Sequence, residues 1–436
     1  MKGAAPVEQG VVAALNADGA GVIREGKTAF VPGALPGETI RFARHRRSRA
    51  YDDADLIEVL DASPQRVTPR CAHFGICGGC ALQHLEPMVQ LAAKQQELAD
   101  SLERIAKVSP QQWLTPLAGP VWNYRRRARL GARYVPKKGR VLVGFRERLK
   151  PYIAEMQRCE ILAIPVDALI EPLAMLIGNL TIRAAVPQIE VAVAQDVVAL
   201  VLRVMVTPTD GDLQQLRDFE LSHAVRFYLQ PGNLTTVQPL TLPAPRLHYR
   251  LAEFDVDLDF EPSDFVQVNG ELNAALVARA VNLLQLTPQS RVLDLFCGLG
   301  NFTLAMARRA REVVGVEGEA ILVERARANA QRNNLANAQF HVANLAEERA
   351  ELPHWLTAAF THVLLDPPRA GAREMLPFLA RLAPQRMVYI SCHPGSLARD
   401  LGILVHEHGY VLQAAGVVDM FPHTAHVESI AVLEPG

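Results

Sequence analysis

The chain has 436 residues, too many for one ordinary domain, so two to four domains are expected. Apolar residues make up 49%, enough for well-packed cores, and 45 basic against 46 acidic residues exclude overall charge as a guide to a partner. The N-terminus lacks an apolar signal-like segment and no apolar run approaches a membrane span, so we expect a cytoplasmic protein without membrane contact.

The first 60 residues predict a small β-barrel. Residues 10–60 alternate short apolar and polar runs broken by glycine, a pattern typical of short antiparallel strands joined by tight turns. Two arginine clusters could follow a phosphate backbone, although a solvated surface is the alternative for each. The clusters are Arg41, Arg44, Arg46, Arg47 and Arg49, and Arg125, Arg126, Arg127, Arg129 and Arg133.

A cysteine-rich stretch, a helix and a β-rich region follow the barrel. Residues 69–85 contain three of the six cysteines, and 88–106 have the apolar periodicity of a helix. Residues 124–260 are rich in strand-like runs and proline, which indicates a β-dominated central domain. Within it, 191–206 is apolar but interrupted by charged residues, so it predicts two buried strands.

The last third of the chain predicts a parallel sheet wound with helices. Short β-like runs alternate there with helical stretches, which is the pattern of an α/β domain. The runs are RVLDLF, EVVGVE, AQFHVA, HVLLDPP and MVYISC, and VESIAVLEP is expected as a final strand.

The ends of the first three of these strands predict a nucleoside site. A turn containing Gly298 and Gly300 follows the first strand, Glu317 ends the second, and Asn344 follows the third. Ligands bind at the carboxyl ends of such strands, and an acid on the second strand can accept hydrogen bonds from ribose hydroxyls. Only two glycines are present, so the pattern favours a nucleoside without a pyrophosphate, such as S-adenosylmethionine, over a dinucleotide. A structural glycine turn is the alternative.

The next two strand ends and the last strand carry reactive groups. Asp366 ends the fourth strand before two prolines, which cannot continue a central strand. Arg369 follows them where amino-group methyltransferases carry an aromatic residue, which argues against amine chemistry. Cys392 ends the fifth strand and Glu428 begins the last. A thiolate can add to carbon 6 of a pyrimidine and activate carbon 5, and a carboxylate can then remove the carbon 5 proton. A buried cysteine and a surface acid are the alternatives.

Four other cysteines suggest a metal site. Cys71, Cys77 and Cys80 are closely spaced around a Gly-Gly turn, and Cys159 is available as a fourth ligand. In a cytoplasmic protein of this size disulfides are not expected. The spacing leaves zinc and an iron–sulfur cluster equally open.

Taken together, the motifs DLFCGLGNF, LLDPPR, ISCHP and HVESI resemble the RNA uracil-C5 methyltransferases that make 5-methyluridine, over roughly residues 260–436. The cysteine set resembles the [4Fe–4S] cluster of the branch acting on 23S ribosomal RNA, and the barrel resembles a TRAM domain, an OB-like RNA-binding module. The resemblance implies three domains: a TRAM barrel at 1–62, a β-rich iron–sulfur domain at 63–260, and a Rossmann-like methyltransferase domain at 261–436.

The same resemblance implies roles for single residues. Cys392 matches the nucleophile and Glu428 the base. The positions that match the S-adenosylmethionine site are Gln267, Phe296, Asn301, Glu317, Asn344 and Asp366. Cys71, Cys77, Cys80 and Cys159 match the cluster ligands, and Phe265 matches an aromatic residue near a flipped base. Cys297 has no role in the pattern and is expected to be packed.

The prediction is therefore a monomeric enzyme that methylates carbon 5 of a uridine in 23S ribosomal RNA. Two alternatives remain open. One is the same chemistry on another RNA such as tRNA, and the other is an RNA-binding iron–sulfur redox sensor with a vestigial methyltransferase domain.

Overall fold

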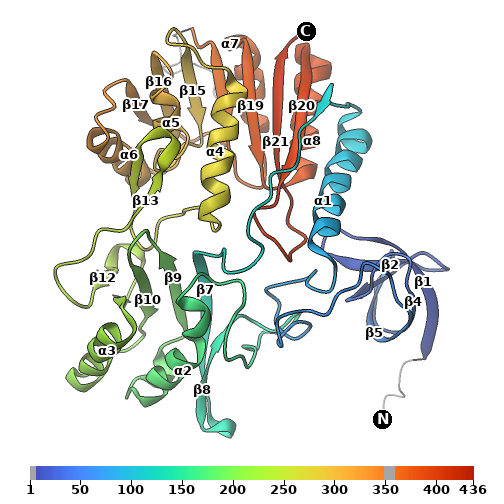
Figure 1. The fold of residues 1–436 in the computed structure, drawn as a ribbon, viewed down its shortest axis with the longest axis vertical. Helices are drawn as coiled ribbons and strands as arrows, with labels where there is room; N and C mark the ends of the chain where they lie inside the picture. The colour runs from blue at the N-terminus through green and yellow to red at the C-terminus, as the bar shows by residue number, and fades with distance from the viewer. Residues whose placement is uncertain (1–5, 348–358) are drawn as a thin grey trace.

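A computed structural model describes residues 6–347 and 359–436 of the chain, whose strands form a closed barrel, two large sheets and one two-stranded hairpin (Figure 1). Within the described residues, no helix is both long and apolar enough to cross a membrane.

The N-terminal strands close into a barrel, as predicted. Its strands are β1 (Val7–Leu15), β2 (Ala20–Ile23), β3 (Ala29–Pro32), β4 (Thr39–Arg47) and β5 (Asp52–Asp61). They pair in the order β1-β2-β3-β5-β4, and β4 pairs with β1 to complete the closure. Inward-facing apolar residues, among them Val12, Ile40 and Phe42, form the barrel core because side chains alternate along each strand.

A six-stranded sheet occupies the middle of the chain. Its order is β12 (Gln238–Pro239), β11 (Val225–Gln230), β10 (Val198–Arg203), β9 (Gln188–Val193), β7 (Arg127–Val135) and β8 (Arg140–Gly144). The predicted pair of buried strands corresponds to β9 and β10. Helix α2 (Ile170–Asn179) packs on β8, and α3 (Asp210–His223) connects β10 to the parallel strand β11.

An eight-stranded sheet contains the last third of the chain. The order is β17 (Ala338–Val342), β16 (Glu312–Glu317), β15 (Arg291–Leu295), β18 (His362–Leu365), β19 (Arg386–Ser391), β21 (Glu428–Pro435), β20 (Tyr410–Val418) and β6 (Gln112–Trp113). The strands from β17 to β19 are parallel, and β21 runs antiparallel beside β19. Strand order reverses between β15 and β18, which is where α/β sheets bind ligands.

Helices pack on this sheet. They are α4 (Gly270–Leu284), α5 (Thr303–Ala307), α6 (Ala320–Arg332), α7 (Leu376–Leu382) and α8 (Pro394–His408). A small hairpin of β13 (His248–Leu251) and β14 (Val256–Asp259) contacts α6. Strand β18 is buried along its whole length because parallel strands are covered on both faces.

One segment of the expected central domain packs elsewhere. Helix α1 (Pro87–Ser101), which continues as a π-helical turn at Leu102–Ala106, lies against α8 and β20, and β6 pairs with β20 (Figure 1). Strand β20 was not among the predicted strands. Because α1 packs on β20, the sequence alone does not predict that this helix belongs to the C-terminal sheet, and it is predicted in the central domain with the segments next to it in the chain.

Candidate active site

Two predicted reactive residues meet where β19 and β21 run side by side. The antiparallel register pairs Ser391 with Ser429. One step further along each strand, Cys392 lies across from Glu428, because antiparallel partners move in opposite directions along the chain. Asp366 follows β18, the other neighbour of β19, so its carboxyl group reaches the same edge of the sheet.

All three groups have a raised pKa, with burial as the largest cause in each case. Glu428 is 4% exposed, and burial, followed by the negative charge of Asp366, raises its pKa well above the usual value. Burial raises the pKa of Asp366 to about 7. The residue Cys392 is exposed, yet partial burial of its thiol and the charges of Glu428 and Asp366 raise its pKa too. A carboxyl group with a raised pKa is a stronger base when ionised, which suits it to remove a proton from carbon.

The glycine turn and the second strand end are joined directly. The N–H of Gly298 donates to Glu317 Oε2 at 3.1 Å, and the N–H of Gly318 donates to Oε1 at 2.6 Å. Phe296, where β15 becomes the turn, has a positive φ of 65°. Non-glycine residues seldom adopt this conformation outside constrained sites. The glycine turn and Glu317 are therefore connected by hydrogen bonds at one edge of the sheet, where the sequence predicts a nucleoside site.

Asn301 is held by two residues that sequence reasoning missed. Its carboxamide exchanges two hydrogen bonds with that of Asn273, both at 3.0 Å, and Tyr249 Oη donates to Asn301 Oδ1 at 2.9 Å. Asn273 is a buried amide on the otherwise apolar face of α4, which is the one signal in the sequence that could have marked it. These partners fix the orientation of the Asn301 carboxamide.

The remaining predicted cofactor residues are more open. Asn344 lies beyond β17 at the margin of the sheet, is exposed, and donates to Glu347 at 2.7 Å. Gln267 is half-buried in the segment that leads into α4, and its neighbour Phe265 is 73% exposed. The backbone N–H of Ala343, directly before Asn344, donates to the carbonyl of Glu317 at 2.9 Å, so Asn344 follows its strand beside Glu317.

Asp294 is a further buried acid that the sequence analysis passed over. It is fully buried within β15, and Thr303 Oγ1 donates to its Oδ2 at 2.5 Å. Burial raises its pKa to about 8, with additional contributions from the charges of Asp366 and Glu317. The signal was a single acid inside an apolar strand, because such a residue is rarely buried without a reason.

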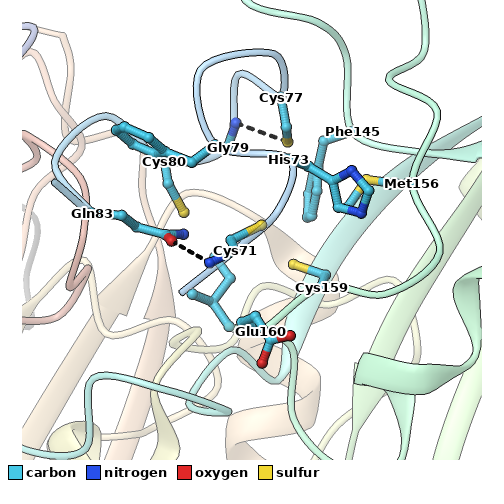
Figure 2. Close-up of a pocket in the computed structure, with 12 residues that line it drawn as sticks. Cys71, His73, Cys77, Gly79, Cys80, Gln83, Phe145, Met156, Cys159 and Glu160 are labelled. Atoms are coloured by element: carbon cyan, nitrogen blue, oxygen red, sulfur yellow. Dashed lines mark hydrogen bonds between the residues drawn. The ribbon is translucent and has the colours of Figure 1, made fainter. Parts of the chain in front are cut away.

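The four other candidate cysteines line one pocket. Figure 2 shows Cys71, Cys77 and Cys80 from one loop and Cys159 from a distant segment around it. The N–H of Gly79 donates to Cys77 Sγ at 3.4 Å, so the Gly-Gly turn does present a backbone donor to a sulfur atom. Cys297 lies apart in the core of the C-terminal sheet, as predicted.

The cysteine pocket is lined largely by apolar side chains. Phe74, Phe145, Met156 and Ile161 contribute to its wall. Burial raises the pKa of Cys80 to about 12 and that of Cys159 to about 11. Thiolates are soft ligands suited to zinc or to iron–sulfur clusters, and a bound cation would lower these pKa values. Among residues 6–347 and 359–436, however, no group of three or more His, Cys, Asp or Glu side chains is placed to hold a metal ion.

Several of the clustered arginines have structural partners. The guanidinium of Arg44 lies between Glu8 and Asp52, at 3.0 Å from each, and its side chain is only 8% exposed. Arg127 donates to the carbonyl of Pro262, and burial lowers its pKa. The two clusters as a whole are therefore not free to contact phosphate, because part of each is used inside the fold.

Two residues of the second cluster lie on a more open face, although Arg129 also pairs with Glu190 at 3.0 Å. Arg129 and Arg133 line a hollow on the six-stranded sheet together with Arg146 and Tyr134. The side chain of Arg47 lies outside the part of the chain that the structure describes.

Comparison with known proteins identifies the family of the chain. A family model described as tRNA (Uracil-5-)-methyltransferase matches residues 246–435. The chain is 51% identical to the 23S rRNA (uracil(1939)-C(5))-methyltransferase RlmD of Xanthomonas axonopodis pv. citri, covering 98% of this chain and 97% of that one. Identity to RlmD of Cupriavidus necator is 50%, with 98% of both chains covered. The chain belongs to the 23S rRNA (uracil-C5)-methyltransferase family.

A solved structure extends the match to the fold. The tRNA (uracil-54, C5)-methyltransferase of Pyrococcus abyssi, in complex with S-adenosyl-L-homocysteine, superposes with a TM-score of 0.76 at 26% identity, covering 98% of this chain and all of the other. The mixed α/β architecture is therefore that of a uracil-C5 methyltransferase of this family.

Proposed function

We propose that the chain transfers a methyl group from S-adenosyl-L-methionine to carbon 5 of a specific uridine in 23S ribosomal RNA, giving 5-methyluridine. The observation that carries the proposal is the register of β19 and β21, which sets Cys392 opposite Glu428. The 51% identity to a 23S ribosomal RNA enzyme supports the choice of RNA.

The proposed reaction uses Cys392 and Glu428 in sequence. The Cys392 thiolate adds to carbon 6 of the uracil, and the electrons of the 5,6 double bond make carbon 5 nucleophilic. Carbon 5 then takes the methyl group as its bond to the sulfonium sulfur breaks, which leaves S-adenosylhomocysteine. Glu428 removes the carbon 5 proton, the double bond re-forms, and the thiolate leaves carbon 6. Atoms and charges balance without an oxidant or a metal.

The cofactor site is proposed along the strand ends. Glu317 would accept from the ribose hydroxyls with the lone pairs that remain on its carboxylate while the N–H of Gly298 stays bound to Oε2. The other residues proposed to contact S-adenosylmethionine are Gln267, Phe296, Asn301, Asn344 and Asp366. Asp366 lies between this edge and Cys392, so it would help to align the methyl group with the base.

We propose a [4Fe–4S] cluster held by Cys71, Cys77, Cys80 and Cys159. The support is the donor set itself, four cysteines around one pocket with a largely apolar lining. When bound, such a cluster supplies a cross-link between the loop at 71–80 and the distant Cys159. Methyl transfer by the route above involves no net oxidation or reduction, so the role of the cluster would be structural.

The N-terminal barrel is proposed to act as a TRAM domain that holds folded RNA. A hollow of about 480 Å³ is lined by the barrel residues Phe30 and Tyr51, by Arg148 beyond the cysteine loop, and by Arg369 and His426 near the active site. Aromatic faces stack on unpaired bases and arginine binds phosphate. The target uracil must leave its stack to reach Cys392, and exposed Phe265 is proposed to contact it.

The domain limits 1–62, 63–260 and 261–436 stand as a proposal, with residues 87–106 of the middle domain packed on the last. Association with 23S ribosomal RNA would place the protein in the cytoplasm, and we propose that it acts as a monomer.

The decisive test compares two RNAs. Labelled S-adenosylmethionine is incubated with the protein and either unmodified 23S ribosomal RNA or unmodified tRNA, and the products are mapped by mass spectrometry of nuclease fragments. A single 5-methyluridine in the ribosomal RNA is expected. Label in tRNA alone would keep the chemistry and overturn the substrate, whereas no label in either would favour an RNA-binding sensor.

A further inference from the structure

The segment 419–427 joins the end of β20 to Glu428 and is held by buried polar groups from α1. Glu428 is the first residue of β21, and strand ends open more readily than strand interiors. Its position therefore depends on how firmly the preceding segment is fixed. In Figure 1 this red loop reaches down toward the N-terminal end of α1.

Gln90 of α1 binds this segment and the cysteine-rich loop at the same time. The N–H of His423 donates to Gln90 Oε1 at 2.9 Å, while Gln90 Nε2 donates to the carbonyls of Leu82 at 2.9 Å and Leu85 at 2.7 Å. Because an amide N–H only donates and a carbonyl only accepts, these partners fix which way the Gln90 carboxamide points. Gln90 is 1% exposed, so water does not replace these bonds.

Lys94 holds the start of the same segment, one helical turn further along α1. Its Nζ lies 2.6 Å from Asp419 Oδ1 and 2.9 Å from the carbonyl of Phe421. Lys94 is 3% exposed and Asp419 is 4% exposed. Removing either partner of such a buried pair leaves an uncompensated charge, which is strongly unfavourable.

Backbone contacts from the cysteine loop complete the attachment. The N–H groups of Ala81 and Leu82, directly after Cys80, both donate to the carbonyl of His423, at 2.9 and 3.0 Å. The ring of Trp122 packs on that of His423 with centroids 4.0 Å apart. The proposed cluster loop and the segment before Glu428 are therefore joined directly by backbone hydrogen bonds.

We propose that Gln90 and Lys94 are positioning residues that keep Glu428 in place to remove the carbon 5 proton. The proposal rests on the role given to Glu428 above. This role explains why α1 buries polar side chains. A helix that covers a sheet normally buries apolar residues, whereas α1 also buries the amide of Gln90 and the ammonium of Lys94, which both contact the segment 419–427. Displacing a catalytic group by about 1 Å can cost on the order of 100-fold in rate.

The test separates methyl transfer from release of the covalent adduct. Single-turnover reactions with a 23S ribosomal RNA fragment give the rate of methyl incorporation, and denaturing gels give the lifetime of the protein–RNA adduct. In Gln90→Met we expect adduct release to slow by about 10- to 100-fold while methyl incorporation and S-adenosylmethionine affinity change by less than about threefold. Gln96→Met, on the exposed face of the same helix, should behave like the unchanged protein.

Two more variants distinguish a positioning role from a general loss of folded structure. Gln90→Glu keeps the acceptor for the His423 N–H but loses the N–H donors to the carbonyls of Leu82 and Leu85, so it should restore only part of the release rate lost in Gln90→Met. Lys94→Met, which removes the other anchor, should slow release as well. Equal loss of methyl incorporation and release in all three, without rescue by Glu, would show a general structural role and overturn the proposal.

A double variant tests whether Gln90 acts through Glu428. Adding Gln90→Met to Glu428→Gln should not lengthen adduct lifetime further, because the base is already absent. If Glu428→Gln accumulates adduct and Gln90→Met does not, the positioning role alone fails. If Glu428→Gln accumulates none, the role of Glu428 fails and the positioning role with it.

Discussion

The two cysteine sites of the molecule differ in what surrounds the thiols. Cys392 is exposed at a strand end with two carboxyl groups beside it. Cys80 and Cys159 lie in a largely apolar pocket with two further cysteines. At both sites burial is the largest cause of a raised thiol pKa. Two carboxyl groups add to the effect at Cys392, whereas for Cys80 and Cys159 the further charges are those of other cysteines.

This difference shows that a raised pKa by itself does not identify a nucleophile. In the cysteine pocket a cation is the partner that would convert thiols to thiolates, since the surrounding wall offers mainly apolar groups. At Cys392 a proton acceptor and access to solvent are both present, so a substrate can reach the thiol and its proton can leave. The reactivity of a cysteine here therefore depends more on its neighbouring groups and on solvent access than on the pKa of its thiol.

Removing the exposed thiol is the strongest test of the contrast. Cys392→Ala should lower methyl transfer by about 10⁴-fold or more, because without the covalent step carbon 5 is a poor nucleophile. S-adenosylmethionine affinity, measured by calorimetry, should be unchanged. Substantial activity in this variant would make Cys392 an ordinary strand-end residue.

Removing the base should give a different outcome at the same site. Glu428→Gln should reduce turnover by about 10²- to 10⁴-fold and leave a methylated protein–RNA adduct on denaturing gels. Glu434→Gln, near the other end of β21, is the matched control and should turn over normally. An inactive Glu428→Gln that forms no adduct would assign the proton removal to another group.

Metal analysis tests the second cysteine site. Protein purified without oxygen should contain iron and sulfide, and Cys159→Ser should lose most of both because one of four ligands is gone. Cys297→Ala, which removes a buried thiol elsewhere, should keep the full content. Zinc without sulfide would replace the cluster with a zinc site.

The smallest effect concerns Asp294, whose pKa is raised to about 8 from an ordinary value near 4. Between these values the folded protein keeps a proton that the unfolded chain releases, so this residue's contribution to stability is lost as pH rises through about 8. Asp294→Asn should therefore flatten the fall in free energy of unfolding between about pH 4 and pH 8. Urea titrations across that range measure it, with Asp196→Asn as an exposed control. Parallel curves for Asp294→Asn and the unchanged protein would contradict the assignment.

Much of the catalytic side of the molecule could be predicted because its residues lie at the ends of continuous apolar strands. Such strands stop at prolines, glycines or charges, and parallel strands bring their carboxyl ends to one edge. The positions of Glu317, Asp366 and Cys392 follow from that rule. The barrel could be predicted for a similar reason, since alternation and glycine turns are local patterns.

The parts that sequence could not supply all depend on contacts between distant segments. Asn273, Tyr249 and Asp294 act through partners that no local pattern connects to them. Gln90 and Lys94 looked like ordinary polar residues of an amphipathic helix. Their role depends on strand order, because β20 lies beside β21 and α1 packs on β20, which places α1 next to the segment before Glu428.

The amino-acid sequence by itself determined which reactive groups this protein carries, because a thiol, carboxyl groups and a glycine turn lie at the ends of individual strands. Only the tertiary structure decided how those groups are held. Strand pairing and the burial of polar side chains involve segments far apart in the chain. These interactions contribute free energy only after the chain has closed the loops that bring the segments together.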